Sequence, residues 1–182
     1  MSILVFAATT SQSSINFTLA QYAASLISDY KMEFLDLNDY ELSLFSVDKE
    51  KEQGIPTLAQ SFYDSIGRSQ GVIVSFAEHN GYVTAAYKNL FDWTSRIHQK
   101  VFQGKPCLFL STSPGAEGAA GTLELVSKKA LFFAAEIKGS FSLPYYQQNF
   151  DREQGIVSEP VLRQALQTQV DAFQRALDDA QS

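Results

Sequence analysis

The stretch Ile3-Leu4-Val5-Phe6-Ala7-Ala8-Thr9-Thr10-Ser11-Gln12-Ser13-Ser14 joins a short apolar run directly to a polar turn. The apolar part does not alternate with polar residues, and such a run predicts a β-strand that is covered on both faces. A helix is expected directly afterwards, because apolar residues recur at helical spacing at Ile15, Leu19, Tyr22, Ala23, Leu26 and Ile27. Ser13 or Ser14 is a suitable N-cap, since a serine hydroxyl accepts a hydrogen bond from an unpaired N–H of the first turn.

The same alternation continues along the chain. Further strands are expected at residues 32–37, 72–76, 107–110 and 137–143, and further helices near residues 56–67, 83–97, 123–133 and 160–177. We expect Ser158 to cap the last helix, with Pro160 in its first turn. Residues 38–53 are polar and acidic, and we expect them to form a long exposed loop.

Five strands that alternate with five helices predict an α/β fold, a parallel sheet with helices on both faces and right-handed crossovers. A chain of 182 residues fits one domain, so we expect residues 1–182 to form a single domain. For this length the expected architecture is a flavodoxin-like three-layer sandwich whose five strands follow the order 2-1-3-4-5. In that topology the ligand crevice lies at the carboxyl ends of strands 1 and 3. Function is therefore expected in the loops at residues 9–14, 77–84 and 111–121.

The charge balance argues against a nucleic-acid partner. The chain carries 14 Lys and Arg against 20 Asp and Glu residues, so its formal net charge is −6, and the sequence pI is about 4.9. The basic residues are scattered, and their longest run is Lys128-Lys129. A protein that binds a phosphate backbone needs a basic face instead.

Cysteine and histidine content limits the chemistry further. Cys107 is the single cysteine of the chain, which excludes an internal disulfide framework and a multi-cysteine zinc site. His79 and His98 lie apart in the sequence, so we expect no metal site. No segment has the pattern of a signal peptide or a membrane span, and we expect a soluble, cytoplasmic protein without a membrane partner.

The first loop carries the groups of an anion site. Hydroxyls and free backbone N–H groups at a helix N-terminus suit a phosphate monoester. These hydroxyls belong to Thr9, Thr10, Ser11, Ser13 and Ser14, and the amide of Asn16 follows. The alternative is that these side chains merely cap the helix and form a turn. The loop lacks the Gly and Lys of a P-loop, which disfavours triphosphate hydrolysis.

The other two loops suit a flat ligand less specifically. Gly115-Ala116-Glu117-Gly118-Ala119-Ala120-Gly121 has the wrong glycine spacing for a dinucleotide signature. Without bulky side chains, its backbone could approach a flat ligand, or it could simply be a flexible turn. Ala77-Glu78-His79-Asn80-Gly81-Tyr82 mixes hydrogen-bonding groups with two rings, as an aromatic ligand with polar edges requires. An ordinary exposed loop is the alternative.

Taken in order, the loops resemble the NADPH-dependent FMN reductase family, which includes quinone, azo-dye and chromate reductases. The family pattern G-S-x-R-x-x-S-x-N-x-x-L-A is similar to Ala8-Thr9-Thr10-Ser11-Gln12-Ser13-Ser14-Ile15-Asn16-Phe17-Thr18-Leu19-Ala20. P-E-Y-N is similar to Ala77-Glu78-His79-Asn80, and K-N-x-x-D-W-x-S-R is intact in Lys88-Asn89-Leu90-Phe91-Asp92-Trp93-Thr94-Ser95-Arg96. S-x-S-P-G-x-x-G is similar to Ser111-Thr112-Ser113-Pro114-Gly115 followed by Gly118.

The resemblance implies an FMN-dependent NAD(P)H oxidoreductase that passes hydride from the nicotinamide to the flavin and on to a small acceptor. The acceptor classes that it implies are quinones, free flavin, azo compounds and metal oxyanions. It also implies a homodimer or homotetramer. The implied FMN-binding residues are Thr9, Ser11, Ser14, Ile15 and Asn16 at the phosphate, Ala77, Glu78, His79 and Asn80 at the polar edge of the isoalloxazine, and Ser113, Pro114 and Gly115 on another side of the flavin. No catalytic side chain is expected, because flavin itself performs the redox chemistry.

Three positions depart from the family pattern. Ser11 stands where the family has arginine, Ala77 where it has proline, and His79 where it has tyrosine. These departures leave open the alternative of a flavodoxin-like binding or regulatory protein with weakened or lost flavin binding. A flavodoxin-type electron carrier is a further alternative. An intrahelical ion pair between Asp92 and Arg96 is also expected, because the two residues are four apart on a helix.

Overall fold

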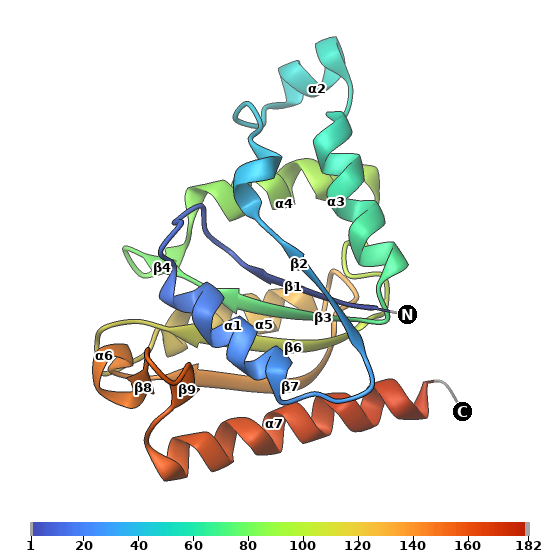
Figure 1. Cartoon of the computed structure of the whole chain (residues 1–182). Helices are drawn as coiled ribbons and strands as arrows, with labels where there is room; N and C mark the ends of the chain where they lie inside the picture. Colours follow the sequence, from blue (N-terminus) through green and yellow to red (C-terminus); the bar gives the residue numbers. More distant parts are fainter. Residues whose placement is uncertain (1, 181–182) are drawn as a thin grey trace.

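The computed structural model describes residues 2–180 and contains a parallel sheet at its centre (Figure 1). Within these residues, five strands form this sheet in the order β2-β1-β3-β6-β7. The strands are β1 (Ser2–Ala7), β2 (Lys31–Leu35), β3 (Gly71–Phe76), β6 (Pro106–Thr112) and β7 (Glu136–Leu143). All neighbouring pairs in it run parallel. The predicted fold class and strand order are therefore confirmed.

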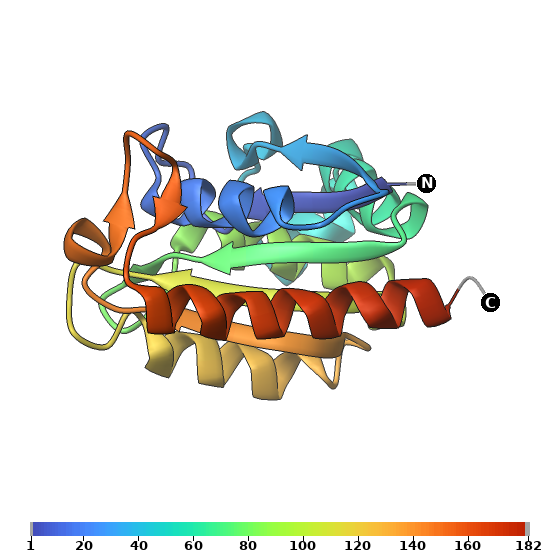
Figure 2. The same ribbon diagram turned by 60° about the horizontal axis from the view of Figure 1, so that its bottom comes forward.

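Helices cover both faces of the sheet. On one face lie α1 (Ile15–Ser25) and the long α7 (Pro160–Asp179), which Figure 2 shows in front of the strands. On the other face lie α3 (Thr57–Arg68), α4 (Ala85–Ile97) and α5 (Ala120–Ala130). Right-handed crossovers place successive helices on the two faces in this way when the chain extends the sheet in both directions from β1.

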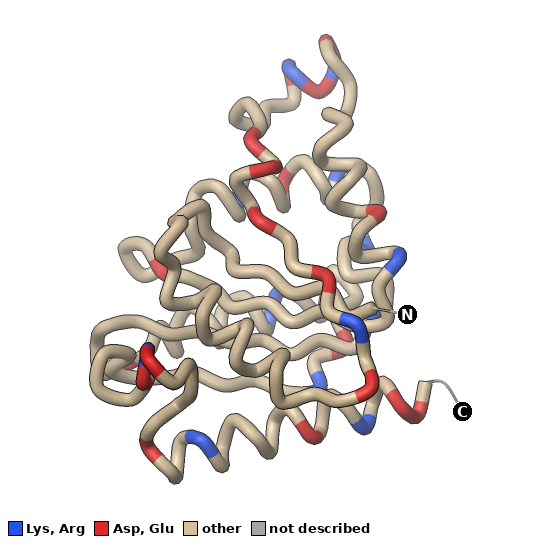
Figure 3. Tube along the Cα trace, viewed as in Figure 1, with Lys and Arg blue, Asp and Glu red and all other residues tan. Residues whose placement is uncertain are grey.

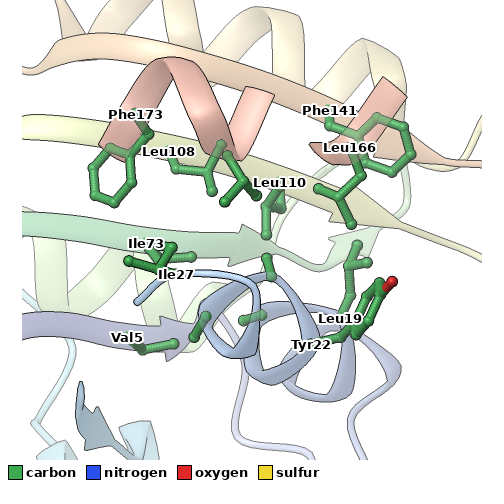
Figure 4. Packing of buried hydrophobic residues seen from close by; sticks show 14 of the residues in the cluster. Val5, Leu19, Tyr22, Ile27, Ile73, Leu108, Leu110, Phe141, Leu166 and Phe173 are labelled. Atoms are coloured by element: carbon green, nitrogen blue, oxygen red, sulfur yellow. The ribbon is translucent and has the colours of Figure 1, made fainter. Parts of the chain in front are cut away.

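The apolar run at the start of the chain contributes to two hydrophobic cores at once. Ile3 and Val5 belong to the core under α1 and α7, whereas Leu4 and Phe6 belong to the core under the other helices. This division follows from the strand period, since successive side chains point to opposite faces of a sheet. Figure 4 shows the first of these cores, where Val5 and other strand residues meet the side chains of α1 and α7. A strand that is buried on both faces requires a continuous apolar sequence.

Several predicted boundaries need correction. The second strand ends at Leu35, because Asp36 caps the 3₁₀ helix η1 (Leu37–Tyr40) by accepting a hydrogen bond from the Asn38 N–H. The predicted long loop at residues 38–53 is wrong where α2 (Val47–Gln53) forms behind its N-cap Ser46. The predicted Ser158 cap of the last helix is also wrong, since the Glu159 carboxylate accepts from the Leu162 N–H at 2.7 Å. Ser14, one of the two alternatives, caps α1.

Several short elements that periodicity did not predict lie at the carboxyl end of the sheet. These are the hairpin of β4 (Glu78–His79) and β5 (Tyr82–Val83), the helix α6 (Tyr146–Asn149), and the hairpin of β8 (Phe150–Asp151) and β9 (Ile156–Val157). Strands of two residues are too short to show an alternating pattern. Within residues 2–180, no helix combines the length and the apolar content that a membrane crossing needs.

Candidate functional site

Three loops meet at the carboxyl ends of β1, β3 and β6. The first loop, residues 8–14, leads into α1; the second, residues 77–84, contains the β4–β5 hairpin; and the third, residues 113–119, leads into α5. After β1 the chain forms β2 on one side of this strand, and it later returns to form β3 on the other side of β1. This is the switch point at which open α/β sheets bind ligands. The structure therefore brings the three groups of predicted site residues to one end of the molecule (Figure 1).

Asn16 joins the first loop to two strand ends. Its side-chain Nδ2 donates to the Thr112 carbonyl at 3.1 Å, and its Oδ1 accepts from the Thr112 N–H at 3.0 Å. The same Oδ1 accepts from the Ser75 hydroxyl at 2.8 Å. All three residues are buried. The amide of Asn16 therefore fixes the start of α1 against β3 and β6, which is a positioning role beneath the first loop.

The first loop presents unpaired backbone donors. The Ser14 hydroxyl accepts from the Phe17 N–H at 3.1 Å, and the Thr9 hydroxyl accepts from the Ser11 N–H at 3.2 Å. Among residues 2–180, no acceptor is found for the backbone N–H groups of Ser13, Ile15 and Asn16. Because the helix dipole adds positive charge at this end, these donors fit the phosphate that FMN carries.

A small cavity adjoins this turn. It has a volume of about 100 Å³ and is lined by Thr9, Ser11 and Ser14 on one side and by Asp36 on the other. The Asp36 carboxylate is engaged by Asn38, whose backbone N–H and side-chain Nδ2 donate to it at 2.9 and 2.8 Å. The wall of the cavity therefore includes a negative charge but no Lys or Arg side chain.

The second loop is a tight hairpin that is fixed at both ends. Asn80 and Gly81 have φ values of 54° and 77°, as a two-residue type I′ turn requires. The Glu78 carboxylate accepts from the Thr122 hydroxyl of α5 at 2.8 Å. At the other end, the Thr84 hydroxyl caps α4 and donates to the Ala8 carbonyl at 2.8 Å. Glu78, His79 and Asn80 are thus held exposed at the rim, while Ala77 is buried.

This hairpin was missed by sequence reasoning, although its signal was present. An Asn-Gly pair between two short extended segments is a strong hairpin indication. The turn matters for the site because it fixes the direction of the residues that are implied at the flavin edge.

The third loop lies against the end of β7. The Tyr145 N–H donates to the Gly115 carbonyl at 2.9 Å, and the Tyr146 N–H donates to the Ser113 carbonyl at 3.1 Å. Gly118 has a φ of 55°, and a Cβ there would lie 2.6 Å from the Leu143 backbone. Gly118 is therefore required for close packing of the loop on β7. Pro114 and Gly115 remain exposed at the rim, and Ser113 is half-buried.

The intact Lys88–Arg96 motif holds a neighbouring segment in place. The Trp93 Nε1–H donates to the Ser43 carbonyl at 2.8 Å, and Asn89 bonds to the backbone of residues 42, 43 and 45. Trp93 is buried. The predicted Asp92–Arg96 pair is wrong: Asp92 pairs with Lys88 at 2.7 Å, and Arg96 pairs with Glu50 of α2 at 2.9 Å.

Two larger cavities flank the crevice. One, of about 370 Å³, lies between Thr10, the η1 segment and the first turns of α4. The other, of about 250 Å³, is apolar and lies between α4 and α5, with Tyr82, Tyr87 and Phe91 in its walls. Burial raises the pKa of the Tyr87 hydroxyl and of the Cys107 thiol, so both stay protonated at neutral pH. Within residues 2–180, no group of three or more His, Cys, Asp and Glu side chains could hold a metal ion.

Known proteins resemble this chain in sequence and in fold. The sequence model of the NADPH-dependent FMN reductase family matches residues 1–148. A quinone reductase of Escherichia coli strain K12 is 27% identical over 135 residues, which cover 73% of this chain and 72% of that protein. A 2-hydroxy-1,4-benzoquinone reductase of a Burkholderia species is 34% identical over 122 residues, which cover 66% of this chain and 64% of that protein.

The solved structures support the fold. The flavoenzyme NAD(P)H:(acceptor) oxidoreductase of Paracoccus denitrificans superimposes with a TM-score of 0.75 at 24% identity, covering 98% of this chain and 97% of that one. Because the family match extends over most of the chain, the family, the enzyme class and the cofactors implied by the motifs are confirmed. The chain belongs to the NADPH-dependent FMN reductase family and is an NAD(P)H-dependent enzyme that uses FMN.

Proposed function

We propose that the chain binds FMN in the crevice at the carboxyl ends of β1, β3 and β6 and passes electrons from NADPH or NADH to a small acceptor. The observation that carries the binding proposal is the set of unpaired N–H groups at Ser13, Ile15 and Asn16. Donors at a helix N-terminus favour a phosphate, because the helix dipole makes that end positive. The family to which the chain belongs supports the same cofactor.

Each loop has a separate task in this proposal. The backbone of the first loop and the hydroxyls of Thr9, Ser11 and Ser14 hold the phosphate. The hairpin residues 77–80 and the third-loop residues 113–115 border the ring system. Asn16 acts beneath the loop, by keeping the start of α1 against the strand ends.

FMN supplies the hydride-transfer chemistry when bound, so the protein needs no acid, base or nucleophile of its own. What the chain provides is a fixed frame. The contacts of Thr84 with Ala8 and of Glu78 with Thr122 lock the hairpin before any ligand arrives. Backbone donors that are fixed in this way stabilise developing negative charge without reorganisation.

We propose a quinone as the acceptor class, because the relatives from Escherichia coli and Burkholderia are named quinone reductases. Free flavin, azo compounds and metal oxyanions are the other acceptors that the family resemblance implies. A homodimer or homotetramer stays a prediction from the same resemblance, and a cytoplasmic location stays a prediction from the sequence pattern.

A spectroscopic titration tests this function. Purified protein is titrated with FMN, and binding is followed by the visible spectrum and by quenching of flavin fluorescence. Addition of NADPH should then bleach the bound flavin, and a benzoquinone should restore the colour over many turnovers. Bleaching by an external reductase but not by NADPH would indicate an electron carrier, and protein that takes up no FMN would contradict the proposal.

A proline substitution tests the role of the unpaired donors directly. Ile15 occupies the first position of α1, where proline is tolerated and removes the N–H. Ile15→Pro should weaken FMN binding about fivefold to tenfold while the helical content stays the same. Val47→Pro makes the same change at the first position of α2, outside the crevice loops, and should leave FMN affinity unchanged.

A further inference from the structure

The β8–β9 hairpin lies beside the start of α1. Both Figure 1 and Figure 2 show it next to the first turns of that helix. Its base is attached by ring contacts: Phe150 packs edge-on against Tyr22 of α1 with centroids 6.0 Å apart, and Tyr146 stacks on Phe150 at 5.0 Å. The hairpin follows the part of the chain that matches the family, which ends at residue 148. The hairpin therefore lies outside the matched residues and packs on α1.

The tip of this hairpin has a fixed backbone. The Asp151 carboxylate accepts from the N–H groups of Glu153 and Gln154 at 2.9 and 3.0 Å, and its carbonyl accepts from the Gly155 N–H at 2.8 Å. Arg152 lies within this turn and is exposed. Among residues 2–180, no carboxylate lies within 4 Å of its guanidinium. The turn therefore presents an unpaired cation.

Tyr146 stands at the base of the hairpin, where it stacks on Phe150, the residue that packs on Tyr22 of α1. The Tyr146 hydroxyl is buried and has no partner in hydrogen-bonding geometry among the described residues. Burial raises its pKa, whereas the Thr18 side chain and the positive charge of Arg152 act in the opposite direction. Thr18 lies in the first turn of α1 and donates to the Ser14 carbonyl at 3.2 Å. The base of the hairpin thus packs on α1, and the turn that carries Arg152 follows directly from this base.

The first loop itself lacks a cation. Residues 8–20 contain neither Lys nor Arg, and the start of α1 is uncharged in Figure 3. Ser11 occupies the position where the family pattern has arginine, and the adjoining cavity is lined by the Asp36 carboxylate. A phosphate dianion bound there would gain from a positive charge that comes from another part of the chain.

We propose that Arg152 supplies this charge: it binds the FMN phosphate from the β8–β9 hairpin and takes the place of the family arginine that Ser11 replaces. The inference rests on the proposed FMN site. It makes the hairpin a phosphate-recognition element, so that this chain holds the cofactor with an arginine contributed from more than 130 residues further along the chain.

A comparison of FMN with riboflavin, which lacks the phosphate, tests the assignment. In Arg152→Gln, the dissociation constant for FMN should rise about tenfold, and the constant for riboflavin should not change. Arg175→Gln removes the same charge from an exposed position on α7 and should change neither constant. Added salt should weaken FMN binding to the wild type more than to Arg152→Gln.

A second substitution tests whether Arg152 takes the place of the family arginine or only adds positive charge to the protein. Ser11→Arg restores the family residue, and in the Arg152→Gln background it should recover most of the lost FMN affinity. An unchanged ratio of FMN to riboflavin affinity in Arg152→Gln would overturn the inference while leaving FMN binding by the wild type intact.

The nicotinamide cofactor is the other source of a phosphate group. If Arg152→Gln keeps its FMN affinity but uses NADPH less well relative to NADH than the wild type does, the side chain binds the nucleotide and the FMN assignment is wrong. Wild-type protein that binds neither FMN nor riboflavin would contradict the proposed function itself, so the two failures are distinguishable.

Discussion

Asn16 and Gly118 are the residues on which the shape of the crevice depends. Asn16 bonds to Thr112 and Ser75 from the first turn of α1, and Gly118 lets the third loop lie against the backbone of β7. The side chain of Asn16 and the Cα of Gly118 both lie below the rim, beneath the exposed loop residues. A small substitution at either position should therefore disturb the loop backbone that holds the exposed residues.

Gly118→Ala should reduce the free energy of unfolding by about 2–4 kcal/mol, because the new Cβ meets the Leu143 backbone and the residue has a left-handed φ of 55°. Gly121→Ala is the matched control, since nothing lies within 4 Å of its Cβ and the position is helical. That variant should gain about 0.5–1 kcal/mol from helix propensity. Urea unfolding followed by circular dichroism measures both changes, and equal stability of the two variants would contradict the steric argument.

Asn16→Ala should cost about 2–3 kcal/mol, since it leaves the buried Thr112 N–H and the Ser75 hydroxyl without their acceptor. Asn38→Ala removes an exposed amide from a turn and should cost less than about 1 kcal/mol. Denaturant midpoints at constant slope report the difference. Similar losses in the two variants would show that the buried contacts of Asn16 are not what stabilises the fold.

At the scale of elements, α4 organises the segment between β2 and α3. Its Trp93 and Asn89 side chains bond to the backbone of residues 42–45, and its Arg96 pairs with Glu50 of α2. Phe45 also packs edge-on against the Trp93 ring, with centroids 5.0 Å apart. A polar, acidic segment without a strong apolar pattern is ordered in this way by one neighbouring helix.

Trp93→Phe keeps an aromatic ring but removes the donor to the Ser43 carbonyl. Amide hydrogen exchange at residues 42–50 should become faster, while exchange in the five-strand sheet stays unchanged. Exchange measured by mass spectrometry on peptides distinguishes these regions. Uniformly faster exchange would mean that the variant lowers global stability and that the tether to residues 42–45 is not local.

At the scale of the whole molecule, two buried acidic groups, a thiol and a phenol, make the stability of the fold depend on pH. Burial raises the pKa values of the Cys107 thiol and the Tyr87 hydroxyl in the folded state. Above pH about 8.5, an unfolded chain releases the cysteine proton while the folded protein retains it. The unfolded state then binds fewer protons, so stability falls as the pH rises.

The free energy of unfolding should be nearly independent of this thiol below pH 8 and should fall above it. The slope should approach about 1.4 kcal/mol per pH unit from the thiol, with a further decline above pH about 10 from Tyr87. Cys107→Ala should remove the first part of the decline. Urea titrations from pH 7 to pH 10.5 under reducing conditions test this, and a variant with the same slope as the wild type would contradict it.

The sequence by itself determined the order of strands and helices, the parallel sheet and the family. These depend on local periodicity, on caps such as Ser14 and on motifs of consecutive residues, and each signal spans fewer than about 20 positions. It also located the three loops, because parallel strands end at the same edge of a sheet.

Tertiary structure alone decided which side chains meet. The contact of Asn16 with Thr112 joins residues 96 positions apart, and Arg96 pairs with Glu50 and not with the neighbouring Asp92. Such choices depend on strand register and on how closely two backbones approach, and a one-dimensional pattern contains neither. The position of the β8–β9 hairpin, whose turn carries Arg152, is of the same kind, since only the packing of Phe150 on Tyr22 brings this hairpin to α1.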